Sequence, residues 1–265
     1  MNVKKGSGVF WAGRGLEKDS RRHYSYAVYA DPAMAERFDR QRFGGPIGAL
    51  LLEDQERILR DSLGDIVGRP VIDVGTGTGR AALALAGWGA QVTGIDASAQ
   101  MLAAARARAT QAGLTVRFER QDAHALSFAS QVFDHAVSLR LLMHAPDWRR
   151  CLSELCRVTR HRIIFDFPAL ASAAALQAVT RRVTQAAGWQ VEAYRVLSVR
   201  TMCHEVERHG FQVQQVHRQF VLPIALHKLV GSRGFTVGIE RCLAAGGLLR
   251  LAGSPVTIVA ERCES

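Results

Sequence analysis

The sequence predicts a Rossmann-like α/β fold, in which a parallel β-sheet carries helices on both faces. Three observations predict it. Short apolar segments alternate with helical segments between residues 71 and 167. The first apolar segment runs directly into a glycine-rich turn, Gly75–Gly79, which an Ala- and Leu-rich helix follows. The 265 residues, 48% hydrophobic and 22% charged, are enough for one domain with a buried core.

The chain divides into a short N-terminal segment and one domain. Residues 1–22 are basic, glycine-rich and aperiodic, and we expect them to be flexible. The domain covers residues 23–265. Within it we expect N-terminal helices at 23–64, a ligand-binding core at 65–167 and a C-terminal, acceptor-side part at 168–265.

Neither a membrane span nor a disulfide framework is expected. The most apolar stretch, 163–180, is interrupted by Asp166 and Pro168, so it does not read as a transmembrane helix. The N-terminus has no apolar signal region. Five scattered cysteines, an odd number without a CxxC pair, predict reduced thiols. We therefore expect a cytoplasmic protein.

The expected elements follow in chain order. Asp31 and Pro32 suit a helix start, and apolar periodicity predicts a second helix at 48–63. Ser98 and Gly113 are the cap and stop of a later helix. The alternating region contains expected strands at 71–74, 91–95, 114–119, 132–139 and 162–167, with helices at 80–88, 98–112 and 147–158 between them.

Beyond Pro168 the alternation becomes irregular. We expect a helix at 169–187, an ambiguous segment at 191–199, a helix at 201–209, a strand at 211–220, a mixed helical stretch at 225–249 broken by glycines, and a last strand at 256–261.

The glycine turn predicts a site for a nucleotide-like ligand, because glycine lets backbone approach the ligand and the following helix offers free N–H groups. The third glycine, Gly79, comes one place earlier than in the GxGxxG dinucleotide fingerprint. Arg80 stands where that pattern has Gly or Ala, and an Arg there would crowd the packing of helix on strand. The spacing therefore disfavours an NAD enzyme.

Residues 71–79, Val-Ile-Asp-Val-Gly-Thr-Gly-Thr-Gly, resemble the first motif of class I S-adenosylmethionine (SAM) dependent methyltransferases. Asp96, which ends the second strand, matches the family's acidic ribose binder. Residues 121–123, Gln-Asp-Ala, match the acidic segment beside the adenine, and 132–134 and 155–158 are similar to later family segments. The resemblance is nearest to the small-molecule branch that includes ubiquinone and menaquinone biosynthesis methyltransferases.

The resemblance covers about residues 65–167 and implies a mostly parallel seven-stranded sheet with SAM as the methyl donor. The cofactor-binding residues that it implies are Asp73, Gly75, Thr76, Gly77, Gly79, Asp96, Ala97, Asp122, Ala123 and Leu139.

The chemistry of three carboxylates agrees with this resemblance. Asp96 can accept hydrogen bonds from both ribose hydroxyls, Asp73 can hold the ammonium group, and Asp122 can accept from the adenine amino group. For a single Asp, a cap or turn role is the better interpretation. Three of them at strand ends beside a glycine turn favour a site, since ligands bind at that edge of such sheets.

Residues on the acceptor side are assigned with alternatives. His144 follows the fourth strand and is the candidate general base for a hydroxyl acceptor; its alternative role is to order the loop or cap the next helix. Arg140 is a candidate to contact an anionic substrate group, or else faces solvent. Tyr24 and Tyr29 are candidates to line the acceptor site, or else pack. His204, His209, His217 and His227 share no metal-ligand spacing, so no metal site is expected.

Together these features predict methyl transfer from SAM to oxygen or carbon of a small-molecule or lipid-like acceptor. The net charge of +10 keeps a nucleic-acid methyltransferase as an alternative. No basic run carries interleaved aromatics, and residues 138–141 lack the Asn/Asp-Pro-Pro-aromatic turn of adenine-amino enzymes, which disfavours it. A SAM-binding regulatory protein without turnover is a second alternative. The apolar segment 220–228 suits a connecting helix, a lid or a peripheral membrane contact. The acceptor and the oligomeric state do not follow from the sequence.

Overall fold

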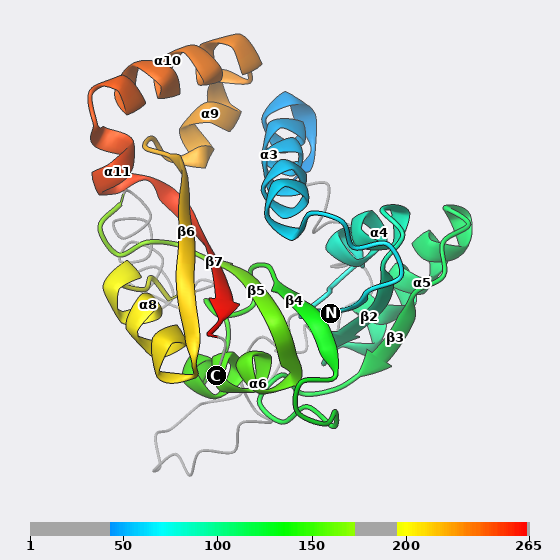
Figure 1. Cartoon of the computed structure of the whole chain (residues 1–265). Helices are drawn as coiled ribbons and strands as arrows, with labels where there is room; N and C mark the ends of the chain where they lie inside the picture. Colours follow the sequence, from blue (N-terminus) through cyan, green and yellow to red (C-terminus); the bar gives the residue numbers. More distant parts are fainter. Residues whose placement is uncertain (1–42, 173–194, 264–265) are drawn as a thin grey trace, which may run out of the picture.

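The computed structural model describes residues 43–172 and 195–263, which contain a seven-stranded sheet in the order β3-β2-β1-β4-β5-β7-β6 (Figure 1). The segment 1–22 and the side chains of Tyr24 and Tyr29 lie outside the described residues. The strands are β1 (Pro70–Val74), β2 (Gln91–Asp96), β3 (Arg117–Arg120), β4 (Phe133–Ser138), β5 (Thr159–Phe167), β6 (Phe211–Phe220) and β7 (Ser254–Arg262).

The sheet is mixed rather than purely parallel. Strands β1 to β5 pair in parallel, as the strand–helix alternation predicts. Strand β7 runs antiparallel to both of its neighbours, β5 and β6. Strand β7 therefore lies between β5 and β6 and runs in the opposite direction to both. Through this pairing β6 and β7, which follow the regular strand–helix alternation, join the same sheet.

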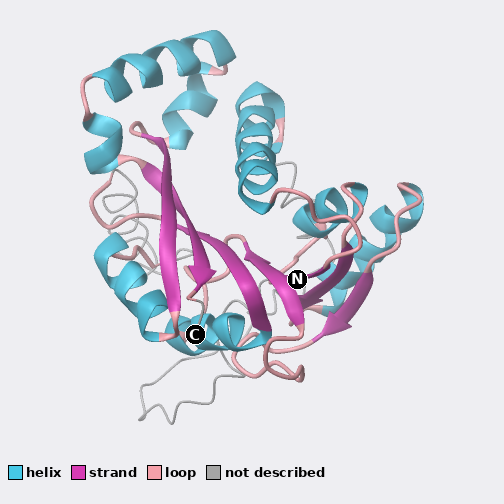
Figure 2. Cartoon of the chain, in the orientation of Figure 1, coloured by secondary structure: helices cyan, strands magenta, loops and turns pink. Residues whose placement is uncertain are grey.

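Helices cover both faces of the sheet, as expected (Figure 2). The described helices are α3 (Gly45–Leu63), α4 (Arg80–Gly87), α5 (Ala99–Gln111), α6 (Trp148–Val158), α8 (Val199–Arg208), α9 (Ile224–Val230), α10 (Arg233–Ala245) and α11 (Leu248–Ala252). Side chains of α3, α4 and α5 pack on one face with Val71 and Val92. Side chains of α6 and α8 pack on the other face with Ile72 and Ile95. Successive strand residues thus serve opposite layers, as the twofold strand period requires.

The expected cap of α5 is confirmed. The Ser98 Oγ accepts a hydrogen bond from the backbone N–H of Met101 at 3.2 Å and so satisfies one of the open donors of the first turn. Asp147 caps α6 in the same way, by accepting from the N–H of Arg150 at 3.2 Å. Helix α5 follows the loop after β2 and α6 follows the loop after β4, so each cap also holds the end of the loop that precedes its helix.

The C-terminal part departs from expectation at two places. The helix predicted to begin at Ala169 does not begin there, because Ala169 forms a β-bridge with Leu197; the rest of 169–187 falls largely on residues 173–194, outside the described residues. The mixed stretch 225–249 resolves into α9, α10 and α11. Gly231 and Gly247 separate these helices at positive φ angles of 67° and 79°, which glycine adopts without strain.

Helices α9 to α11 lie together beyond the end of β6, and α3 contacts both α9 and α10 (Figure 1). Within the described ranges no helix is long and apolar enough to cross a bilayer. All five cysteines are free thiols, and Cys151 and Cys156 are buried. Burial raises the pKa of Cys156 to about 12, so this thiol stays protonated and acts as a packing residue.

Candidate functional site

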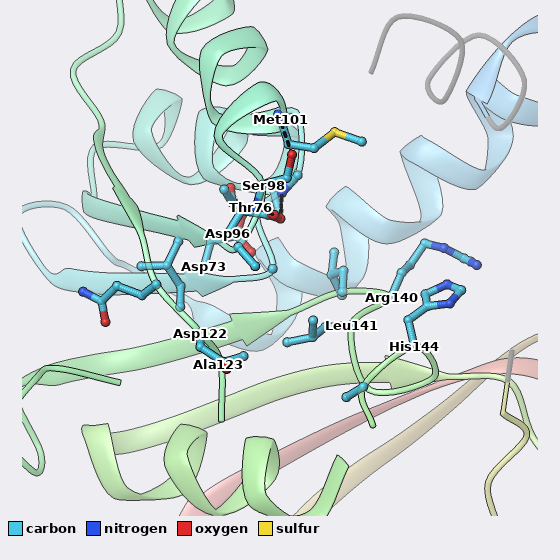
Figure 3. Close-up of a pocket in the computed structure, with 18 of the residues that line it drawn as sticks. Asp73, Thr76, Asp96, Ser98, Met101, Asp122, Ala123, Arg140, Leu141 and His144 are labelled. Carbon is cyan, nitrogen blue, oxygen red and sulfur yellow. Dashed lines mark hydrogen bonds between the residues drawn. The ribbon is translucent and has the colours of Figure 1, made fainter. Parts of the chain in front are cut away.

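A pocket opens at the carboxyl ends of β1, β2 and β4 (Figure 3). This is the edge where ligands bind in open α/β sheets. The sequence-predicted residues that line it are Asp73, Gly75, Thr76, Gly77, Asp96, Ala97, Asp122, Ala123, Leu139, Arg140 and His144. Gly79 does not line it. The structure thus brings the predicted donor-side and acceptor-side residues into one cavity.

The glycine turn is fixed to the neighbouring strand and leaves open space at its middle. The N–H groups of Gly75 and Thr76 both donate to the carbonyl of Ile95, at 2.9 and 2.8 Å. Gly75 and Gly77 have φ angles of 77° and 55°, a region that side chains other than glycine's rarely adopt. A Cβ built on Gly77 would meet no atom within 4 Å. A ligand can therefore approach the backbone at Gly77.

Gly79 has a packing role instead. It is the N-cap of α4, and a Cβ at this position would lie 2.9 Å from the Cβ of Ala105 in α5. The close helix packing that dinucleotide folds obtain from their third glycine is therefore supplied by Gly79.

Arg80 does not crowd the sheet, and that physical reason for disfavouring an NAD site is wrong. Its guanidinium points toward α3, where Nη1 donates to the Oε1 of Gln55 at 2.6 Å. The guanidinium also stacks 3.8 Å from the ring centroid of Phe43. Arg80 thus ties the helix after the glycine turn to α3.

Asp96 ties the glycine turn to the loop that precedes α5. One carboxylate oxygen accepts from the N–H of Gly77 at 2.9 Å and the other from the N–H of Ser98 at 2.8 Å. Burial raises the pKa of Asp96, and these backbone donors act in the opposite direction. A carboxylate has about four acceptor positions, so each oxygen retains capacity for one more donor. Two adjacent ligand hydroxyls match that capacity.

Asp73 holds the turn from inside. Its Oδ2 accepts from the Thr76 hydroxyl at 2.6 Å and from the N–H of Ala82 at 3.1 Å. Burial raises the pKa of Asp73 to about 6, against the stabilising effects of the Thr76 hydrogen bond and of the Arg80 charge. The role as a turn carboxylate, which the sequence left as an alternative, is therefore present in the structure. Because Asp73 also lines the pocket, the charge of its carboxylate can attract a cationic group of a ligand.

Asp122 is paired with a residue that the sequence reasoning missed. Its Oδ1 lies 2.6 Å from the Nδ1 of His124 and accepts the backbone N–H of His124 at 3.0 Å. The Nε2 of His124 accepts from the N–H of Asp147 at 3.4 Å, which fits the tautomer with the proton on Nδ1. Both side chains line the pocket. The Asp-x-His spacing at 122–124 was the available signal.

The loop after β4 forms the side of the pocket where the sequence predicts the acceptor. The backbone N–H of His144 donates to the carbonyl of Leu141 at 2.9 Å, and His144 is buried. Arg140 adopts a φ of 64°, and its N–H donates to the carboxylate of Asp166 at the end of β5. Figure 3 shows the side chains of Arg140 and His144 extending away from Asp96 and Asp122.

Several lining residues carry no chemical signature in the sequence. Met101 comes from the start of α5, and Leu141 packs against Gly75. Apolar residues of this kind resemble any core residue until the fold is known. In the described parts of the chain, His, Cys, Asp and Glu side chains form no group of three that could hold a metal ion.

Comparison with known proteins finds a methyltransferase domain in the region that carries the motifs. Residues 71–162 match the model of a methyltransferase domain family. The fold is similar to a magnesium protoporphyrin IX methyltransferase from Synechocystis crystallised with SAH, with a TM-score of 0.62 and 18% identity over 90% of this chain and 99% of that one. At this identity the likeness shows the fold.

Two curated relatives are similar over shorter segments. An uncharacterized protein of Mycobacterium tuberculosis is 34% identical over 135 residues, which are 51% of this chain and 43% of the relative. A ubiquinone biosynthesis O-methyltransferase of Coxiella burnetii is 39% identical over 85 residues, 32% of this chain and 36% of the relative. The matched segments thus span less than half the length of these relatives. The resemblance of the core to class I SAM-dependent methyltransferases is confirmed.

Proposed function

We propose that this chain uses its class I methyltransferase domain to transfer a methyl group from SAM to a small-molecule or lipid-like acceptor, at oxygen or carbon. The observation that carries the proposal is that the backbone of Gly77, which faces open space, donates a hydrogen bond of 2.9 Å to the half-buried carboxylate of Asp96. The open space at Gly77 can admit a ligand, and the neighbouring Asp96 carboxylate can accept hydrogen bonds from the hydroxyl groups of that ligand.

The residues of the pocket fit SAM at three points. Asp96 has acceptor capacity for the two ribose hydroxyls. Asp73, adjacent to the turn, is our candidate to attract the ammonium group, and Asp122 and Ala123, which line the same pocket, are our candidates to contact the adenine. SAM supplies a methyl group on a sulfonium, which is a good leaving group. The protein therefore has to align the acceptor with that methyl and exclude water.

His144 is our candidate general base for an acceptor that begins as a hydroxyl. It lies on the acceptor side of the same pocket and is buried. The apolar residues Leu139, Leu141 and Pro146 line this side as well, which supports a compact acceptor with apolar surface. The relative from Coxiella burnetii, whose name refers to ubiquinone biosynthesis, agrees with such an acceptor class.

The test is incubation of the purified chain with SAM carrying a labelled methyl group and a fractionated cell extract. We expect protein-dependent label in a small-molecule or lipid fraction, with no label in a parallel reaction that lacks the chain. Label in RNA or DNA would replace this proposal with a nucleic-acid methyltransferase. Binding of SAM with no labelled product in any fraction would indicate a SAM-binding protein without turnover.

Gly77→Ala is expected to separate ligand binding from stability. Alanine in the left-handed region costs about 1–2 kcal/mol of folding stability, but no neighbouring atom obstructs its Cβ. The methyl group would occupy pocket space, so SAM affinity should fall. Gly113→Ala is the matched control, because Gly113 has a φ of 65°, no atom within 4 Å of an added Cβ, and a place outside the pocket. Calorimetry on both variants should show equal loss of stability and weaker SAM binding only for Gly77→Ala; equal affinities would remove Gly77 from the site.

A further inference from the structure

The pocket carries a guanidinium, that of Arg140, whose hydrogen-bond donors are largely unused by the described residues. Arg140 lines the pocket, and within residues 43–172 and 195–263 its guanidinium makes one hydrogen bond, from Nη2 to the Sδ of Met143 at 3.4 Å. Its Nε is buried and has no hydrogen-bond partner. A buried donor without an acceptor costs free energy, more so for a charged group. The site is therefore incomplete as a purely structural arrangement.

The position of Arg140 is imposed by its backbone. A φ of 64° is unusual for a residue other than glycine, and the carboxylate of Asp166 holds it by accepting the Arg140 N–H. The other oxygen of Asp166 accepts from the Nε2 of Gln55 at 3.4 Å. The Asp166 carboxylate thus accepts from a backbone donor and an amide donor. The charge of Arg140 acts to lower the pKa of Asp166, but among the described residues no hydrogen bond joins the guanidinium to this carboxylate. Backbone strain of this kind is found where a side chain has to be presented.

A second cation approaches from a distant part of the chain. Lys228 on α9 is half-buried, and its pKa is lowered first by burial and then by the charge of Arg140. The charge of Arg140 therefore acts on Lys228, which is not itself among the residues that line the pocket. Arg80, the other arginine that lines the pocket, is held by Gln55 and by the ring of Phe43. Among the described residues that line the pocket, Arg140 is therefore the arginine with an unsatisfied donor.

We infer that the methyl acceptor carries a carboxylate or phosphate group, which Arg140 binds through its planar fork while Lys228 adds charge. This inference rests on the proposed function, since the bound anion is taken to be part of the acceptor. A guanidinium pairs with two oxygens of such a group at once, which supplies the missing acceptors. The sulfonium of SAM would add one more positive charge to the pocket, and an anionic acceptor offsets it.

The experiment compares two ligands of equal shape, 2-naphthoate and 2-naphthamide, on the full chain with and without SAH. Calorimetry is expected to show naphthoate binding at least about tenfold more tightly than the amide, the range of one charge-assisted hydrogen bond. Raising the salt concentration should reduce the preference. Arg140→Gln should abolish it, Lys228→Met should reduce it several-fold, and Arg241→Gln, at an exposed position of α10, should leave it unchanged.

Each outcome either supports or overturns the inference. Equal binding of the two ligands, or a preference that survives in Arg140→Gln, overturns the inference. Retained SAH affinity in Arg140→Gln shows that the variant is folded and that the proposed function does not depend on this result. If the chain binds naphthoate through Arg140 but does not bind SAH, the anion site stands and the proposed function fails.

Discussion

Replacing Asp96 with alanine is expected to weaken SAM binding about 10- to 150-fold, the range of about 1.5–3 kcal/mol that hydrogen bonds to a charged group contribute. Two losses combine. The acceptor for the ligand's hydroxyls disappears, and the N–H groups of Gly77 and Ser98 lose the carboxylate that aligns them at 2.9 and 2.8 Å. Titration calorimetry of the folded variant with SAM and SAH measures the effect.

Two further variants make this result specific. Asp96→Asn keeps one oxygen acceptor but replaces the other with a donor, so its affinity should lie between those of Asp96→Ala and the unchanged chain. Asp61→Ala removes an exposed carboxylate of α3 and should leave the affinity unaltered. Unchanged affinity in a folded Asp96→Ala protein would take Asp96 out of the site.

Asp73→Asn is expected to stabilise the ligand-free protein at neutral pH while weakening its SAM binding. The pKa of Asp73 is raised from 3.8 to about 6 by burial, so the folded state binds the proton more tightly than the unfolded state. The stabilising contribution of the protonated form is full below pH 3.8 and is lost as the pH rises to about 6. A shift of this size corresponds to about 3 kcal/mol.

The measurement is the free energy of unfolding of both proteins between pH 4 and pH 8. Asparagine does not titrate and can still accept the N–H of Ala82 and pair with the Thr76 hydroxyl. The stability of Asp73→Asn relative to the unchanged chain should therefore rise across pH 4–6 and level off above it. Asp61→Asn, on the exposed side of α3, provides the baseline. A difference that stays flat with pH contradicts the role given to burial at Asp73.

Ligand affinity gives a second readout on the same variant. If the Asp73 carboxylate attracts the ammonium of SAM, the affinity should fall when Asp73 is neutralised, by acid in the unchanged chain or by the asparagine at any pH. A variant that is more stable and yet binds SAM less tightly would show that the buried charge serves the ligand rather than the fold. Equal SAM affinity of Asp73→Asn and the unchanged chain would show that Asp73 only holds the glycine turn and does not bind the ligand.

The parts of the fold with local signals were predictable. Ser98 identified the start of α5 because a hydroxyl that accepts a first-turn N–H is a short-range feature. The strand at 211–220 was predicted with its observed bounds. The helix predicted to begin at Ala169 failed because a bridge to Leu197, a long-range contact, takes the same backbone. The antiparallel insertion of β7 likewise depends on strand pairing between segments far apart in the sequence.

The candidate site shows the same division. Carboxylates and glycines at strand ends were recognisable because their residue types and spacing carry the chemistry. The direction of Arg80 was not, since its partner Gln55 lies on α3. The approach of Lys228 to Arg140 was equally hidden, because α9 lies beyond an irregular region of the chain. Tertiary contacts between separate elements determine such side-chain directions, and the hydrophobic periodicity of a sequence carries no information about these contacts.

Calorimetric titration of the purified, folded chain with SAM and with SAH tests most directly whether the pocket beside Gly77 and Asp96 is a methyl-donor site. We predict saturable binding of both compounds, with dissociation constants between about 1 µM and 1 mM, the usual range for enzyme substrates. A protein that is folded by circular dichroism and yet binds neither compound up to millimolar concentration would contradict the assignment.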